Sequence, residues 1–312
     1  MAWTWVASLA TGNVSQVDRV WTFLPLIYTS WFTFYPTLDS APFLYRVHGV
    51  SSRAAMMFLL QSLWMLRLSY NTWRRGLFSL SEEDYRWAIL RRKVPAWLFQ
   101  VINLSFIVII QNIILFMLGL PTYRVLVEEN GPLSTPDYIL FSLGIVTLAL
   151  EFTADNQQWS FHDFKSSGEV SGTQWPGANI QWTEHDRKRG FANRGLWAWS
   201  RHPNFACEQT FWIIQSLFPV LASNKLDPLS PDVVTPLWAL VPSLTLCMLF
   251  WASTRFSESI SLSKYPIEYS AYQARVAMFV PFVTPALKLY HSWRGDNERL
   301  ERLIWEEPAK QD

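Results

Sequence analysis

Arginine, histidine and asparagine stand within four positions of one another where the chain reads Arg201-His202-Pro203-Asn204. An apolar run begins directly afterwards, near Phe205. Proline is favoured in the first turn of a helix, so the motif predicts a helix start. Unbonded N–H groups and the helix dipole favour anions there, so Arg201 and His202 would face a phosphate or a similar group. The alternative is a basic, tryptophan-flanked membrane anchor.

A second polar group lies upstream, where Glu151, Asp155, Gln158 and His162 follow one another at helical spacing. This spacing places them on one helix face, and Lys165 extends the same stripe. Carboxylates at the end of a membrane span are costly in lipid, so they should face a wet or protein-lined cavity. The functional interpretation is a cofactor or substrate pocket. The alternative is a helix end solvated by water.

A third group follows the last apolar segment and consists of Glu258, Tyr265, Tyr269 and Tyr272, interrupted by Pro266. A tyrosine row at a membrane edge is typical of an interfacial aromatic belt. Tyrosine can also stack on, or hydrogen-bond to, an adenine or nicotinamide ring. The spacing of the row leaves both interpretations open.

The elements that must position these groups are apolar. Half of the 312 residues are hydrophobic and 16% are charged, whereas about a quarter is charged in a soluble domain. Six apolar segments can be read along the chain, at 21–38, 54–70, 96–120, 138–154, 205–222 and 233–253. The third runs for about 25 residues without a charge, enough to cross a bilayer. We therefore expect an all-α, polytopic membrane bundle of six transmembrane helices, or seven with a short N-terminal helix.

Basic residues favour one orientation of this bundle. They gather in the segments 73–95 and 155–204 and after residue 253, which the positive-inside rule assigns to the cytosol together with both termini. The sequon that begins at Asn13 would then lie on the wrong side for glycosylation. Arg67, inside the second segment, would snorkel to the cytosolic face.

Composition also limits the partners. A net charge of +1 gives no reason to expect nucleic acid. The two cysteines, Cys207 and Cys247, lie in apolar stretches and cannot form a disulfide framework, and no cluster has zinc-ligand spacing. We expect no bound metal ion. The expected partners are a lipid-like small-molecule substrate and the membrane. The oligomeric state stays open.

These groups together resemble a known family. The matching motifs are Glu151-x3-Asp155-x-Gln157, Phe164-Lys165, Gly195-Leu196-Trp197 through Asn204 with Glu208, Lys264-Tyr265-Pro266 with Tyr269 and Tyr272, and upstream Trp64-x2-Arg67-Leu68 and Glu83-Asp84-Tyr85-Arg86-Trp87. They resemble the membrane steroid 5-alpha-reductase-like proteins, in particular their DUF1295 branch, over roughly residues 15–285. Phe205 and Cys207 replace the tyrosine and glycine more usual in the central motif, and no glutamate precedes Glu82.

The resemblance implies one membrane domain over 1–290, a cofactor-binding half at 138–285 and a charged cytosolic tail at 291–312. It implies NADPH bound from the cytosolic side, and it places the protein in the endoplasmic reticulum. The matching cofactor-binding positions are Asp155, Lys165, Arg201, His202, Asn204, Glu258, Tyr265, Tyr269 and Tyr272. The chain has no Gly-x-Gly-x-x-Gly turn, so a Rossmann domain is not expected.

By this resemblance the protein is an oxidoreductase that reduces a carbon–carbon double bond in a lipid or steroid-like enone. Tyr28, Tyr35 and Glu151 are candidates for polarising the carbonyl or supplying the proton. One alternative is an enzyme similar to the isoprenylcysteine carboxyl methyltransferases, which share an Arg-His-Pro-x-Tyr element and bind S-adenosylmethionine. The other is a non-catalytic membrane protein that retains the fold.

Overall fold

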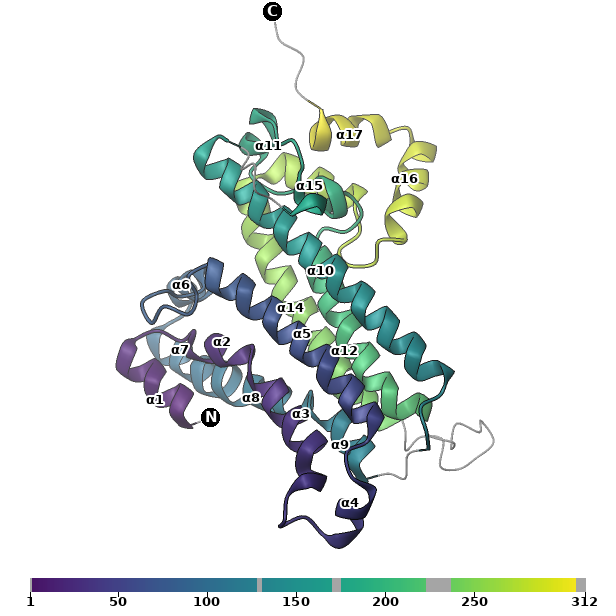
Figure 1. Cartoon of the computed structure of the whole chain (residues 1–312). Coiled ribbons are helices and arrows are strands. Elements are labelled where there is room, and N and C mark those ends of the chain that lie inside the picture. The colour runs from purple at the N-terminus through teal and green to yellow at the C-terminus, as the bar shows by residue number, and fades with distance from the viewer. Residues whose placement is uncertain (1, 128–130, 170–174, 223–236, 307–312) are drawn as a thin grey trace, which may run out of the picture. The chain divides into compact units, whose positions relative to one another are not determined.

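The computed structural model describes residues 2–127, 131–169, 175–222 and 237–306, which form helices joined by turns and loops (Figure 1). The chain forms two compact units. Unit 1 comprises Met1–Ile145 and Phe211–Met248, and unit 2 comprises Val146–Thr210 and Leu249–Asp312. Three long helices contribute residues to both units, namely α10 (Thr135–Ser167), α12 (Pro203–Ala222) and α14 (Val241–Lys264). The expected all-α class is confirmed for the described residues.

Three helical stretches are long and apolar enough to cross a membrane: Ala96–Val127, Thr135–Ser167 and Trp238–Lys264. The membrane character read from the sequence is therefore supported. The larger number of six to seven spans stays a prediction. The second apolar segment forms α5 (Ser52–Arg74), but polar side chains such as Gln61 and Arg67 lower its hydropathy. The start of the sixth predicted span, before residue 237, lies outside the described residues.

Unit 1 is built from short helices around α5. They are α1 (Ala2–Thr11), α2 (Gln16–Trp21), α3 (Leu24–Phe34), η1 (Tyr35–Thr37), α4 (Phe43–His48), α6 (Tyr85–Lys93), α7 (Ala96–Ile102), the π-helical η2 (Asn103–Ile110), α8 (Gln111–Met117), α9 (Leu120–Val127) and η6 (Trp238–Leu240). Helix α3 packs against α5, α8 and α9. The fully buried Trp64 of α5 lies against Phe211 and Trp212 of α12. An aromatic contact thus joins the two longer helices.

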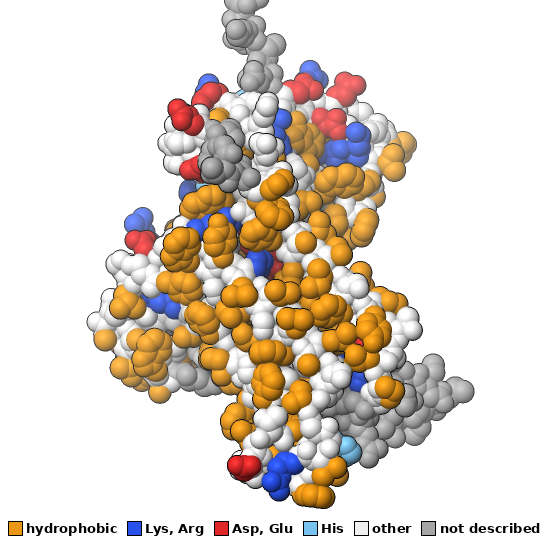
Figure 2. Space-filling model, in the orientation of Figure 1, with side chains coloured by type: hydrophobic (Ala, Val, Ile, Leu, Met, Phe, Trp, Pro, Cys, Tyr) orange, Lys and Arg blue, Asp and Glu red, His pale blue; other side chains and the backbone are white. Residues whose placement is uncertain are grey.

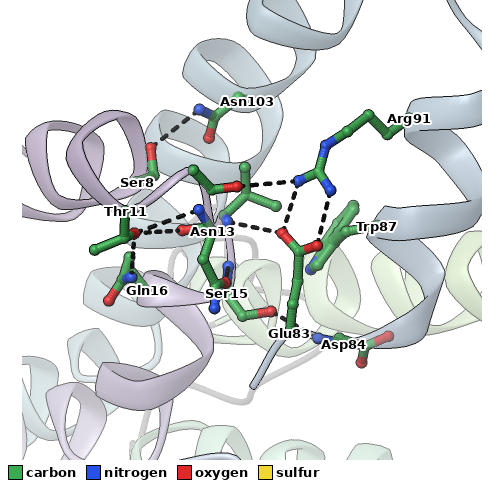
Figure 3. Close-up of polar contacts among 12 residues, drawn as sticks. Ser8, Thr11, Asn13, Ser15, Gln16, Glu83, Asp84, Trp87, Arg91 and Asn103 are labelled. Atoms are coloured by element: carbon green, nitrogen blue, oxygen red, sulfur yellow. Dashed lines mark hydrogen bonds and ion pairs between the residues drawn. The ribbon is translucent and has the colours of Figure 1, made fainter. Parts of the chain in front are cut away.

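A polar cluster ties the N-terminal helices of unit 1 to the segment before α6 (Figure 3). The side-chain amide of Asn13 donates to the carbonyls of Leu80 and Glu82, at 3.2 and 2.8 Å. Glu83 accepts from the backbone N–H that follows Asn13 and pairs with Arg91 at 2.7 Å. Asn13 is only 7% exposed. In the folded protein its amide is therefore inaccessible to glycosylation, whichever side of a membrane it faces.

Unit 2 combines the ends of α10, α12 and α14 with shorter helices. These are η3 (Pro176–Ala178), α11 (Glu184–Arg189), η4 (Gly195–Ala198), α15 (Pro266–Arg275), α16 (Val283–Arg294) and α17 (Asn297–Trp305). One core lies around Phe161, Trp182 and Trp197. Another joins Tyr272 to Ile304. Figure 2 shows charged side chains gathered at the end of unit 2 that carries α11 and α17, and hydrophobic ones along its long helices.

The C-terminal segment is part of this fold. Residues 291–312 were expected to form a charged tail, but α17 packs on α15 and Ile304 is fully buried. The carbonyl of Ile304 accepts hydrogen bonds from Arg189 and from the Asn193 amide. The indole N–H of Trp305 donates to the Asn193 carbonyl at 2.8 Å. The apolar side chains of α17 therefore act as core residues, and the charged ones cover its outer face.

Candidate functional site

The predicted helix start is where the sequence places it. Helix α12 begins at Pro203, after the short turn η4. The backbone N–H groups of Arg201 and His202 donate to the carbonyls of Ala277 and Met278, at 2.8 and 3.1 Å. These two bonds anchor the start of α12 to the segment that follows α15.

Arg201 makes its contacts inside the protein. Its guanidinium meets both carboxylate oxygens of Glu258, at 2.7 and 3.1 Å, and donates to the carbonyls of Gln273 and Val276. The two charged residues are 7% and 4% exposed. A guanidinium has five N–H donors, and these four contacts engage most of them. Arg201 is therefore mainly a partner of Glu258, and few of its N–H donors are left for an external phosphate.

Glu258 is the centre of this group. The His202 ring nitrogen Nε2 lies 2.9 Å from its carboxylate, and the Gln273 amide donates to it at 2.9 Å. The His202 ring stacks on Phe205, with 5.7 Å between ring centroids. Gln273 was not predicted from the sequence. Its position one turn after Tyr269 on the same helix was the available signal.

Asn204 and Asp155 form a second contact in the site. The Asn204 amide donates to an Asp155 carboxylate oxygen at 3.3 Å, and the residues are 9% and 2% exposed. The Asn204 carbonyl oxygen accepts from the backbone N–H of Phe205 at 3.0 Å. Glu151, one turn before Asp155, is 1% exposed. An amide and two carboxylates therefore lie in the interior of unit 2, as the functional interpretation of this stripe requires.

The predicted stripe on α10 is correct only in its first half. The helix continues unbroken to Ser167, but Gln158 is half-buried and His162 is exposed. The enclosed face is instead the neighbouring face of α10, where Gln157 is 4% exposed. Its amide donates to the Gly177 carbonyl and accepts from the Leu196 N–H, at 2.8 and 2.9 Å. The packing of residues 177–197 decided which face was enclosed, and helical spacing alone could not reveal it.

Lys165 and Tyr265 meet at the end of the site. The Lys165 ammonium donates to the Gly190 carbonyl at 2.9 Å and to the Tyr265 hydroxyl at 3.3 Å. Gly190 has a φ of +80°, and a Cβ at this position would overlap the Tyr265 ring. A glycine is therefore required here by both its backbone conformation and the close approach of the ring.

Tyr269 and Tyr272 belong to the core, not to an interfacial belt, since they are 4% and 1% exposed. The Tyr272 hydroxyl donates to the Trp197 carbonyl at 2.5 Å. Burial raises the pKa of both phenols above the usual value of 10, and the Glu258 carboxylate raises that of Tyr269 further. Both hydroxyls therefore stay protonated at neutral pH.

The two tyrosine candidates for catalysis lie in unit 1, whereas Glu151 lies in unit 2. Tyr28 meets the edge of Phe116 at 5.2 Å between centroids, and Tyr35 packs near Tyr45 at 5.9 Å. Both are half-buried in aromatic surroundings. These ring contacts give neither tyrosine a distinct catalytic role.

The family model described as "Protein of unknown function (DUF1295)" matches residues 4–276. The chain belongs to the DUF1295 family. The match includes every cofactor-binding position expected in this DUF1295 member and ends before α16. An uncharacterized protein of Schizosaccharomyces pombe, C594.04c, is 35% identical over 279 residues, which cover 89% of this chain and 75% of the yeast protein. No solved structure matches. The wider relationship to the steroid 5-alpha-reductase-like proteins stays a prediction.

Proposed function

We propose that this DUF1295 protein is a membrane-embedded, NADPH-dependent reductase of a carbon–carbon double bond in a lipid-like enone. The observation that supports it best is the contact of Asn204 with Asp155. Asn204 closely follows Arg201 and His202 in the chain, and Arg201 pairs with Glu258 in the same unit. These side chains are gathered in the interior of unit 2 and do not point separately into lipid or water. Polar side chains buried among apolar helices are costly, so a group of them indicates a functional site.

The chemistry of these side chains fits a nicotinamide cofactor. An amide and a carboxylate offer the donor and the acceptors that a carboxamide or a ribose needs, and Asn204 and Asp155 supply them. For phosphate, Lys165 suits the role better than Arg201. An ammonium has three N–H donors, and the bonds to Gly190 and Tyr265 engage two of them. We assign Arg201, with His202 and Glu258, to holding the start of α12 in position.

NADPH would supply a hydride, and the protein would have to orient the substrate and provide a proton. Tyr28, Tyr35 and Glu151 remain the candidates for the proton.

The test is cofactor binding by the purified full-length protein. We expect NADPH to raise the melting temperature in detergent, and titration calorimetry to give a saturable isotherm. Asn204→Ala should weaken NADPH binding by about tenfold or more, since a hydrogen bond to a polar ligand group is lost. Gln209→Ala is the matched control, because this amide lies on the same helix and bonds to the carbonyl of Phe205, one turn earlier.

The rival functions give different results in the same assay. Stabilisation by S-adenosylmethionine without stabilisation by NADPH would favour the methyltransferase alternative. No response to either cofactor, in protein that melts cooperatively, would favour the non-catalytic alternative. An equal loss of binding in Asn204→Ala and Gln209→Ala would contradict the site, even if NADPH binds.

A further inference from the structure

An apolar stripe runs along the outer face of α16. Phe282, Leu289 and Trp293 are 86%, 72% and 84% exposed, and Ala286 between them is exposed as well. These positions are spaced i, i+4, i+7 and i+11, which aligns them on one helix face. Figure 2 shows hydrophobic side chains gathered over this part of unit 2. A continuous stripe of large apolar side chains is unusual on a surface that meets only water.

The opposite face of α16 is attached firmly. The Thr284 hydroxyl donates to the carbonyl of Trp199 at 2.6 Å and accepts from the N–H of Ala277 at 2.9 Å. At the other end, His291 is buried and lies 2.7 Å from Asp296. The helix therefore has a defined orientation within unit 2. The stripe faces outward because the opposite face of α16 is packed within unit 2.

The start of α16 is fixed at the level where α12 begins. Residues 277 and 278 accept the backbone bonds of Arg201 and His202, and Thr284 bonds to Trp199. Trp199 and Val280 near this junction are 54% and 55% exposed. Helices α10 and α14 contact the start of α12 through Asp155 and Glu258, and both belong to stretches that can cross a membrane. The stripe thus begins beside the start of α12, where that helix meets two stretches that can cross a membrane.

The residue types along α16 are those of a membrane surface. Tyr290 and Trp293 have rings that favour the boundary between headgroups and acyl chains. Lys288 and Arg294 flank the stripe, with side chains 54% and 51% exposed. A helix with large apolar side chains on one face and basic residues beside it is typical of helices that lie in the plane of a bilayer surface.

We propose that α16 lies in the membrane plane, with the stripe of Phe282, Ala286, Leu289 and Trp293 inserted at the headgroup boundary, so that the lipid surface is its partner. The stripe begins beside the start of α12 and has exposed basic side chains on its flanks, and both features suit lipid better than a second protein. This inference does not depend on the reductase activity.

The test uses spin labels on the full-length protein in nanodiscs of phosphatidylcholine and phosphatidylglycerol. Serine replaces Cys207 and Cys247, and single cysteines are introduced by Ala286→Cys and Leu289→Cys. Met248→Cys, 72% exposed on α14, is the lipid control. Glu298→Cys, exposed on α17, is the water control. The ratio of oxygen to nickel-chelate accessibility is measured at each site.

We expect the ratio at Ala286 and Leu289 to lie several-fold above that at Glu298 and to approach that at Met248. Ratios equal to that at Glu298 would overturn the proposal, because the stripe would then face water. Spin–spin broadening between labels at Leu289 would also overturn it, because a second copy of the chain would cover the stripe. Ala286→Cys changes one small side chain, so a failure to fold is not expected to obscure the result.

Discussion

Arg201 and Glu258 form a two-point ion pair in the interior of unit 2, with oxygen–nitrogen distances of 2.7 and 3.1 Å. The pair joins the start of α12 to the last turns of α14. A charge in such surroundings is tolerated only while its partner is present. Removing either residue should therefore affect stability before it affects any ligand.

Arg201→Ala should lower the free energy of unfolding by about 3–5 kcal/mol, because it leaves the Glu258 carboxylate buried without its main cation. Replacing both residues, Arg201→Met with Glu258→Leu, should cost less than either single change. Equilibrium unfolding of the purified protein measures all of these. If Arg201→Ala folds with unchanged stability and loses only NADPH binding, the guanidinium is a phosphate contact and our assignment is incorrect.

Asn204→Asp tests the contact between α12 and α10 in another way. The change would bring a second carboxylate to the oxygen of Asp155 that now lies 3.3 Å from the Asn204 amide. Two like charges at this distance repel, so the melting temperature should fall below that of Asn204→Ala. Thermal melting of Asn204→Asp and Asn204→Ala measures this difference. The reverse order would mean that the side chains do not face each other.

Gly190→Ala should destabilise unit 2 by about 1–3 kcal/mol, since φ is positive and a Cβ would overlap Tyr265. Gly295→Ala is a matched control, because Gly295 has a φ of +78° but no atom within 4 Å of the added Cβ. The difference between the two melting temperatures isolates the steric overlap from the backbone strain. Equal losses would show that the Tyr265 ring moves aside without cost.

Asp186 should make stability depend on pH. Burial raises the pKa of its carboxyl, but hydrogen bonds from Thr183 and the charge of Arg194 outweigh this and lower the pKa below the ordinary 3.8. A lowered pKa in the folded state stabilises the protein above pH 3.8, and this contribution is lost as the pH falls through the folded-state value.

The melting temperatures of wild-type protein and Asp186→Asn should therefore differ at neutral pH and converge below about pH 4. Glu184→Gln is the control, because the Glu184 side chain is 63% exposed and its pair with Arg187 lies at the surface. A difference that persists at low pH would mean that Asp186 acts through its shape and not through its charge.

Local features of the site were predictable from the sequence. Proline marks the start of α12, and the polar spacing on α10 places Glu151 and Asp155 in the interior. The family resemblance predicted that Glu258 belongs to the same site. Its role as the common partner of Arg201 and His202 depends on the packing of α14 against the start of α12, which no periodicity encodes.

Other features needed the fold itself. Gln157 and His162 lie on the same helix, but only Gln157 is enclosed, because residues 177–197 pack on its side. Helix α17 lies in the segment 291–312, where charged residues outnumber apolar ones, and this composition favours a charged tail. Its buried Ile304 becomes informative only once α15 is in place beside it.

The hydrogen bonds of Arg189 and Asn193 to the carbonyl of Ile304 make the loop after α11 depend on α17. The loop that these two side chains occupy also presents Gly190 to Lys165. A stop codon just ahead of Ile304 would leave α10, α12 and α14 intact, yet it would remove the acceptor of both side chains and release this loop. Alleles truncated there should behave as loss-of-function alleles, although the three described stretches that are long and apolar enough to cross a membrane are still translated.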